Sequence, residues 1–166
     1  TPESADLYAM LRSMQAGGCT EGVMEVSSHG IDQDRVNGLN LAVAAFLNLT
    51  QDHLDYHGSM EEYFRAKCKI FNGANGSLPS VGVINADCPW GRRLLEEVPP
   101  QVRLMTFGEA LDADFRAREI HLSQNGTEFL LECPEGEFAV SSPLLGRYNV
   151  SNVLAAFAIA SGMGQP

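Results

Sequence analysis

The spacing of apolar residues predicts alternating helices and strands along the first two thirds of the chain. Apolar positions recur at helical spacing over residues 4–17 and 59–72, and a third helix is expected over residues 87–97. Short apolar runs predict strands at residues 22–26, 41–48, 81–85 and 102–107. Strands that alternate with helices in this way indicate right-handed crossovers and a mostly parallel sheet.

The pattern changes after Gly108. Alternating apolar and polar positions, joined by an Asn-Gly pair and by PEGE, predict three short antiparallel strands between residues 115 and 142. A last helix follows GRYNVSN, and its apolar face contains Val150, Val153, Leu154 and Phe157. We therefore predict one three-layer α/β domain over residues 1–166, with a mostly parallel sheet flanked by helices and a small antiparallel sheet.

The helix at residues 59–72 carries a lysine where its pattern favours an apolar residue. At about 100° per residue, one face holds an apolar arc made of Met60, Tyr63, Phe64 and Phe71. Lys67 lies near the middle of that arc. Such a lysine either extends its ammonium group to solvent or pairs with a buried acid. Alternatively, burial lowers its pKa, and the neutral amine can act as a nucleophile, form a Schiff base or take up carbon dioxide.

Composition and charge narrow the range of functions. The 166 residues, 45% of them apolar, suffice for one domain with a core. A formal charge of -10 and the lack of any Lys or Arg run argue against a nucleic-acid partner. The longest apolar stretches are too short to span a bilayer and no signal peptide opens the sequence, so we expect a cytoplasmic protein without a membrane partner. Four scattered cysteines indicate reduced thiols, with Cys68 and Cys133 as packing residues.

Polar residues follow two of the predicted strands, those at residues 22–26 and 41–48. Ligands of parallel sheets bind beyond the carboxyl ends of strands. If these strands are neighbours, one crevice gathers Glu25, Ser27, Ser28, His29, Asn48, Thr50 and His53. A carboxylate and an imidazole there can hold a divalent ion such as Mg²⁺, which prefers oxygen ligands. A carbamate on Lys67 would add such an oxygen, although spacing alone leaves this open.

Each of these residues also has a structural interpretation. Glu25 suits a helix N-cap or a partner of a helix dipole, and Ser27 and Ser28 suit capping positions. His53 suits a hydrogen-bonded position in a loop. Structural, surface or loop-ordering roles are also expected for Asp55, Tyr56, His57 and His121.

Three longer motifs stand out: MEVSSHGIDQDRV, NLTQDHLDYHGSMEEYFRAK and GRYNVSNVLAA. Together with the opening TPES, they resemble the central domain of the Mur ligases, and the match covers nearly the whole chain. The resemblance is closest to the branch that adds the third residue to UDP-MurNAc-L-Ala-D-Glu. It implies amide-bond formation in the cytoplasmic stage of peptidoglycan synthesis, with ATP and Mg²⁺ and through an acyl phosphate.

The resemblance also implies roles for individual residues. Glu25 and His53 correspond to magnesium ligands. Lys67 corresponds to a lysine whose carbamate supports the metal between ATP and the acceptor. Contacts with the UDP-MurNAc-dipeptide are implied for Thr1, Ser27, Gln33 and Arg35. Asn149 falls where an asparagine meets the adenine side of ATP.

One departure from the family concerns the phosphate loop, which lies upstream of the region matched by TPES; GANG at residues 73–76 lacks its lysine. The N-terminal uridine-binding and C-terminal domains also do not match any part of the chain. We therefore expect a truncated central domain of a monomeric parent enzyme, with negligible ATP hydrolysis or ligation by the chain alone. The choice between diaminopimelate and lysine as the third residue is left open.

Two alternatives to the ligase remain. One is an inert module that only holds a sugar-nucleotide peptide. The other is a metal-dependent hydrolase with a carbamylated lysine, although such sites usually need histidines in metal-binding pairs and this chain has four histidines and no HxH.

Overall fold

The structure is a computed structural model, and it describes residues 1–165. The chain divides into two compact units, which we describe one at a time. Unit 1 comprises residues 1–40 and 51–78, and unit 2 comprises residues 41–50 and the chain from residue 79 onward. No helix among the described residues is both long enough and apolar enough to cross a bilayer.

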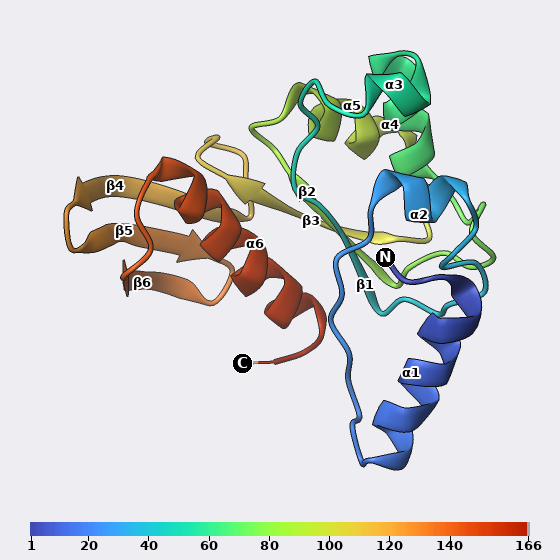
Figure 1. The fold of residues 1–166 in the computed structure, drawn as a ribbon. Helices are drawn as coiled ribbons and strands as arrows, with labels where there is room; N and C mark the ends of the chain where they lie inside the picture. The colour runs from blue at the N-terminus through green and yellow to red at the C-terminus, as the bar shows by residue number, and fades with distance from the viewer. Residues whose placement is uncertain (166) are drawn as a thin grey trace. The chain divides into compact units, whose positions relative to one another are not determined.

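Unit 2 is built on one six-stranded sheet with the order β1-β2-β3-β4-β5-β6 (Figure 1). Parallel pairing joins β1 (Val43–Phe46), β2 (Val81–Asn85), β3 (Arg103–Gly108) and the start of β4 (Phe115–Ser123). Antiparallel pairing adds β5 (Gly126–Cys133) and β6 (Gly136–Ser142). The predicted mixture of strands is confirmed. The antiparallel strands are continuous with the parallel ones, because Phe107 and Gly108 of β3 pair with the first two residues of β4.

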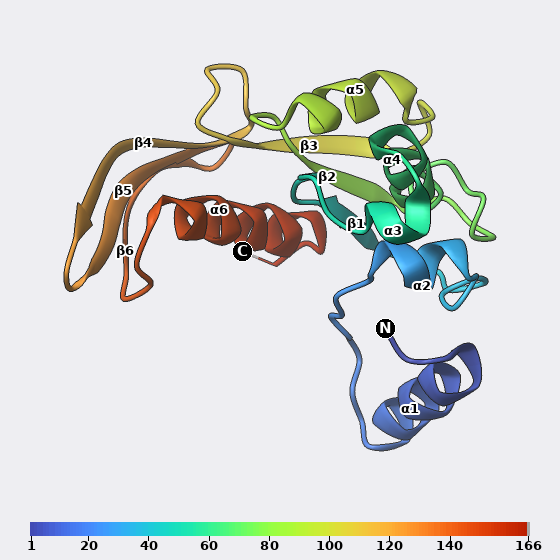
Figure 2. The same ribbon diagram turned by 45° about the horizontal axis from the view of Figure 1, so that its top comes forward.

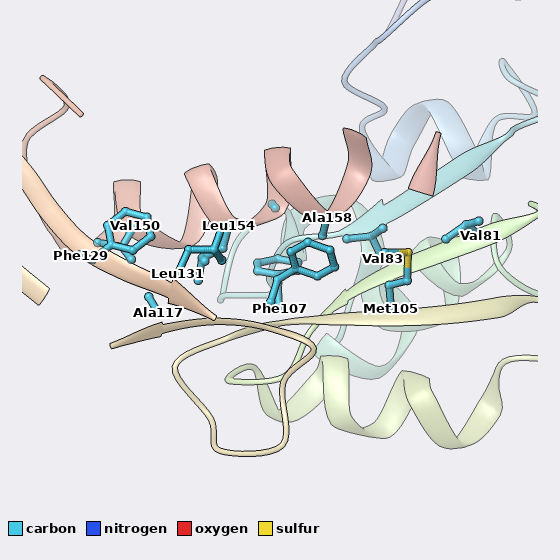
Figure 3. Packing of buried hydrophobic residues seen from close by; sticks show 12 residues of the cluster. Val81, Val83, Met105, Phe107, Ala117, Phe129, Leu131, Val150, Leu154 and Ala158 are labelled. Carbon is cyan, nitrogen blue, oxygen red and sulfur yellow. The ribbon is translucent and has the colours of Figure 1, made fainter. Parts of the chain in front are cut away.

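Helices cover both faces of this sheet and make the predicted three layers. Figure 2 shows α5 (Pro89–Glu97) on one face and α6 (Arg147–Gly162) on the other. All five residues of β2 are buried, as expected for a strand with both faces covered. Figure 3 shows how α6 packs Val150, Leu154 and Ala158 against side chains of the strands, among them Phe107.

The predicted apolar face of α6 is only partly confirmed. Val150 and Leu154 are buried and Val153 packs at the edge of the core, but Phe157 is 42% exposed. At about 100° per residue, the face centred between Leu154 and Ala158 points about 80° away from Phe157. Small alanines therefore take positions at the sheet that the prediction gave to a phenylalanine.

Unit 1 is helical in its described residues. It contains α1 (Ser4–Ala16), α2 (Ser28–Asp32), α3 (Leu54–His57) and α4 (Met60–Cys68). The prediction of a first helix is confirmed. The helix predicted over residues 59–72 is present but ends at Cys68 and is followed by turns. Both α2 and α3 pack against α4, so the three short helices support one another.

The prediction of a strand at residues 22–26 is wrong. This segment is irregular, and Val23 is 84% exposed. A strand needs a neighbour to satisfy its backbone groups, and no described residue pairs with this segment. The prediction that two adjacent strands bring these polar residues together is therefore wrong. Asn48 and Thr50 belong to unit 2, whereas Glu25 and His53 belong to unit 1.

The four cysteines are free thiols, as predicted. Cys68 is buried in the packing of α4. Cys133 is only half-buried, and its thiol donates to the carbonyl oxygen of Gly136 at 3.5 Å. The prediction of a packing role therefore holds for Cys68 and in part for Cys133.

Candidate functional site

Lys67 lies on the last turn of α4, on the side where the helix packs. This helix starts at a well-formed cap, because the Ser59 hydroxyl accepts from the backbone N–H of Glu62 at 3.1 Å. The side chain of Lys67 is half-buried, and its Nζ lies 5.4 Å from the centre of the Tyr63 ring. Burial lowers the pKa of Lys67, while the negative charge of Glu25 opposes that shift. The amine is thus less strongly protonated than an exposed lysine and lies in the field of Glu25.

His53 lies against the same tyrosine. It adopts a left-handed conformation with a φ of 55°, just before α3, and its backbone N–H donates to Asp52 at 2.7 Å. Its ring centre lies 5.8 Å from that of Tyr63, with the rings nearly perpendicular. Tyr63 is therefore a common neighbour of His53 and Lys67, the two side chains that the sequence analysis linked to one metal.

Three histidines surround Tyr63 and Tyr56 in one ring cluster. The ring centre of His29 lies 5.0 Å from that of His53, 5.4 Å from that of His57 and 4.1 Å from that of Tyr56. His57 stacks on Tyr63, with 5.0 Å between ring centres. The predicted sharing of one site by His29 and His53 is consistent with this cluster.

His57 has the structural position expected for it, and its hydrogen-bond partner lies in a distant segment of the chain. Its Nε2 lies 2.9 Å from the hydroxyl of buried Ser28. Burial lowers the pKa of His57, and the nearby charge of His29 acts in the same direction.

The four residues expected to contact the dipeptide substrate form one hydrogen-bonded group. The backbone N–H of Ser27 donates to the Thr1 hydroxyl at 2.9 Å, and Nη1 of Arg35 donates to the Thr1 carbonyl at 2.9 Å. Nε of Arg35 donates to Oε1 of Gln33 at 3.0 Å. Gly30 permits the approach of Thr1, since a Cβ there would lie 2.8 Å from that of Thr1.

Ser27 also confirms the capping prediction made for it. Its hydroxyl accepts from the backbone N–H of Gly30 at 3.1 Å and so caps α2. Ser28 lies inside α2 and hydrogen-bonds to His57, so the capping interpretation of Ser28 is wrong. Tyr56 orders its loop as predicted, because its hydroxyl donates to Asp32 at 3.1 Å. His121 is an exposed residue of β4, which confirms its surface position.

Comparison with known proteins identifies the family of this chain. A family description, the Mur ligase middle domain, matches residues 1–160. The chain belongs to the Mur ligase middle-domain family. The resemblance that the three motifs indicated is therefore confirmed.

Two sequence relatives carry the same name. The Mur ligase middle domain described here is 45% identical over 166 residues to a UDP-N-acetylmuramoyl-L-alanyl-D-glutamate--2,6-diaminopimelate ligase of Thermosynechococcus vestitus, covering the whole chain and 33% of that protein. A ligase of the same name from Bacillus licheniformis is 44% identical over 164 residues, covering 96% of the chain and 33% of that protein. The chain thus spans about a third of the length of these relatives.

Solved structures agree with the sequence relatives. The structure of a ligase with the same name matches with a TM-score of 0.91 and 34% identity, over the whole chain and 34% of that protein. MurF of Thermotoga maritima, solved with ADP, matches with a TM-score of 0.64 at 21% identity and shares the fold. The match to the first structure confirms the fold predicted for this Mur ligase middle domain.

Asn149 belongs to unit 2, in the first turn of α6. Its Nδ2 donates to the carbonyl of Leu145 at 2.8 Å, and its Oδ1 accepts from Asn152 at 3.1 Å. These bonds hold the amide in one orientation at the start of the helix. The adenine contact that the resemblance implied for Asn149 stays a prediction.

A divalent ion at this site would need donor atoms from Glu25, His53 and Lys67 together. No group of three His, Cys, Asp or Glu side chains within the described part of this Mur ligase middle domain gathers as a metal site. Glu25 and His53 would supply one oxygen and one nitrogen. A carbamate on Lys67 would add oxygen donors of the kind that Mg²⁺ prefers. The donor set therefore fits Mg²⁺ when Lys67 is counted as its carbamate.

Proposed function

We propose that this Mur ligase middle domain is the ATP-dependent catalytic part of a cytoplasmic, monomeric ligase. It joins a third amino acid to UDP-MurNAc-L-Ala-D-Glu in peptidoglycan synthesis, through an acyl phosphate. The names of the relatives support 2,6-diaminopimelate as that amino acid. Family membership favours this reaction over the hydrolase alternative. The observation that carries the proposal is that Lys67 and His53 both lie beside the Tyr63 ring, with the charge of Glu25 acting on Lys67.

The proposed chemistry assigns different work to the two groups of side chains. Glu25, His53 and the carbamate of Lys67 would hold Mg²⁺, which supplies charge neutralisation between the ATP phosphate and the acceptor carboxylate. The pKa of Lys67 is lowered by burial, which favours the neutral amine that reacts with carbon dioxide. Thr1, Ser27, Gln33 and Arg35 would orient the acceptor, and Asn149 would contact adenine.

The decisive experiment replaces Lys67 by alanine in the full-length protein that carries this domain. We expect turnover to fall by about 100-fold or more, because an electrostatic group at the reacting centre is lost. Short carboxylic acids added to the assay should restore part of the activity by occupying the vacated space. Circular dichroism should show an unchanged fold.

A matched control uses the same helix. Arg65 is an exposed residue of α4 that pairs with Glu61 at 3.0 Å, so Arg65→Ala should leave turnover unchanged. Near-normal turnover of Lys67→Ala without added acid would contradict the proposal. We further propose that the 166 residues by themselves do not hydrolyse ATP, because they contain no GxxxxGK loop to hold its phosphates.

A further inference from the structure

An ion pair ties the last residue of α2 to the residue that follows α4. Nζ of Lys69 donates to Oδ1 of Asp32 at 2.6 Å, and each side chain is only 34% exposed. The hydrogen bond from Lys69 is the main cause that lowers the pKa of Asp32, so this carboxylate stays ionised at neutral pH. Both oxygens of Asp32 are then acceptors with no proton of their own.

The second oxygen of Asp32 determines the direction of the next hydrogen bonds. The Tyr56 hydroxyl donates its proton to Oδ2 at 3.1 Å. Because a hydroxyl has only one proton, it can only accept from its other neighbour, and Nε2 of Gln33 lies there at 3.4 Å. With its amino group on Tyr56, the amide of Gln33 turns its oxygen toward the guanidinium of Arg35.

The ion pair at one end and the Arg35 guanidinium at the other thus favour the same direction for each bond in this series. If the Gln33 amide turned over, its oxygen would face the lone pairs of Tyr56 and its amino group would face a guanidinium that has no acceptor. Two favourable contacts would become two repulsive ones. The ionised carboxylate therefore reinforces, through Tyr56, the orientation of the Gln33 amide that the guanidinium also requires.

We propose that Tyr56, held by the Asp32–Lys69 pair, is a positioning residue for binding of the acceptor substrate. It acts by fixing the Gln33 amide, which in turn presents Arg35 to an acidic sugar-nucleotide peptide. This inference rests on the proposed function, in which Gln33 and Arg35 contact that substrate. The ring of Tyr56 also packs on His29, with 4.1 Å between ring centres, so removal of the hydroxyl alone leaves this packing in place.

A purely structural role would give a different result. The pair could simply hold α2 against α4, and its loss would then lower the melting temperature without a selective effect on substrate binding. A positioning role instead raises KM and Kd for the acceptor while leaving kcat nearly unchanged, because the reacting groups around Lys67 are untouched. The split between KM and kcat separates the two roles.

The test measures KM, kcat and the calorimetric Kd for UDP-MurNAc-L-Ala-D-Glu in the full-length protein that carries this domain. Tyr56→Phe and Lys69→Met should each raise KM and Kd by about 3- to 10-fold, the effect of one hydrogen bond. KM and Kd of the double variant should be close to those of the single variants, because both substitutions act through one series of hydrogen bonds. Lys69→Arg, which keeps the charge, should restore most of the affinity.

Two further variants make the outcome unambiguous. Arg65→Met breaks the exposed pair with Glu61 on the same helix and should leave KM unchanged. Gln33→Ala tests the proposed acceptor site itself and should raise KM at least as much as Tyr56→Phe. An unchanged KM in Tyr56→Phe together with a raised KM in Gln33→Ala would overturn the positioning role of Tyr56 and leave the acceptor site standing. An unchanged KM in Gln33→Ala would overturn both the acceptor site and the inference.

Discussion

At the scale of single residues, the sequence predicted the burial of Lys67 better than its surroundings. The apolar arc of its helix predicted a half-buried lysine, and the structure confirms that position. The place of Glu25 in this site was predicted from a strand that does not form, and the structure shows only that its negative charge acts on the pKa of Lys67. The roles of His57 and Tyr56 were predicted but their partners were not, because hydrogen bonds between segments far apart in the chain cannot be inferred from spacing.

The Asp32–Lys69 pair predicts a pH dependence of stability. The folded state lowers the pKa of Asp32 below its value in the unfolded chain, which is about 3.9. The stabilisation by Lys69 is therefore fully present above the unfolded pKa, and it is lost as the pH falls through the folded pKa. Since both side chains are about a third exposed, we expect the pair to contribute only about 0.5–1 kcal/mol at neutral pH.

Urea unfolding of the chain and of its Lys69→Met variant from pH 7 downward checks this expectation. The difference in the free energy of unfolding should be constant down to about pH 5 and should shrink toward about pH 2. A difference that grows as the pH falls would mean that Asp32 is not the partner that Lys69 stabilises.

At the scale of elements, local signals were reliable and non-local ones were not. Ser59 with Glu62 three residues later is the pattern of a helix start, and α4 begins there. The segment at residues 22–26 has the composition of a strand, but a strand also needs a neighbour, which local composition cannot provide. The face of α6 was misjudged at Phe157 because helical spacing gives the separation of positions but not which face meets the sheet.

The cap of α4 predicts a measurable loss of stability. Ser59→Ala removes the acceptor for the backbone N–H of Glu62 and should lower the free energy of unfolding by about 1 kcal/mol. Thermal unfolding of the purified chain measures the effect. The control is Ser13→Ala at an exposed position within α1, where alanine favours the helix and stability should not fall. Equal losses in the two variants would show that the Ser59 cap contributes nothing specific.

At the scale of the whole molecule, the class of fold followed from the order of its elements. Alternating strands and helices predicted the parallel part of the sheet, and period-two alternation predicted the antiparallel part. The continuity of the two parts depends on the pairing of Phe107 and Gly108 with β4, and its two residue pairs are too few to leave a pattern in the sequence. The division into two compact units likewise depends on contacts between distant segments.

The core of unit 2 gives the last prediction, which compares two residues of α6 that the sequence had placed on one face. Leu154 is fully buried between α6 and the sheet, whereas Phe157 is 42% exposed. Leu154→Ala should leave a cavity and cost about 2–5 kcal/mol in the free energy of unfolding. Phe157→Ala should cost at most about 1 kcal/mol even though it removes the larger side chain, because much of the ring already contacts water. Urea unfolding of both variants measures the two costs. A larger loss for Phe157→Ala would mean that the helix turns its phenylalanine inward, as the sequence pattern suggested, and that the packing of α6 described here is incorrect.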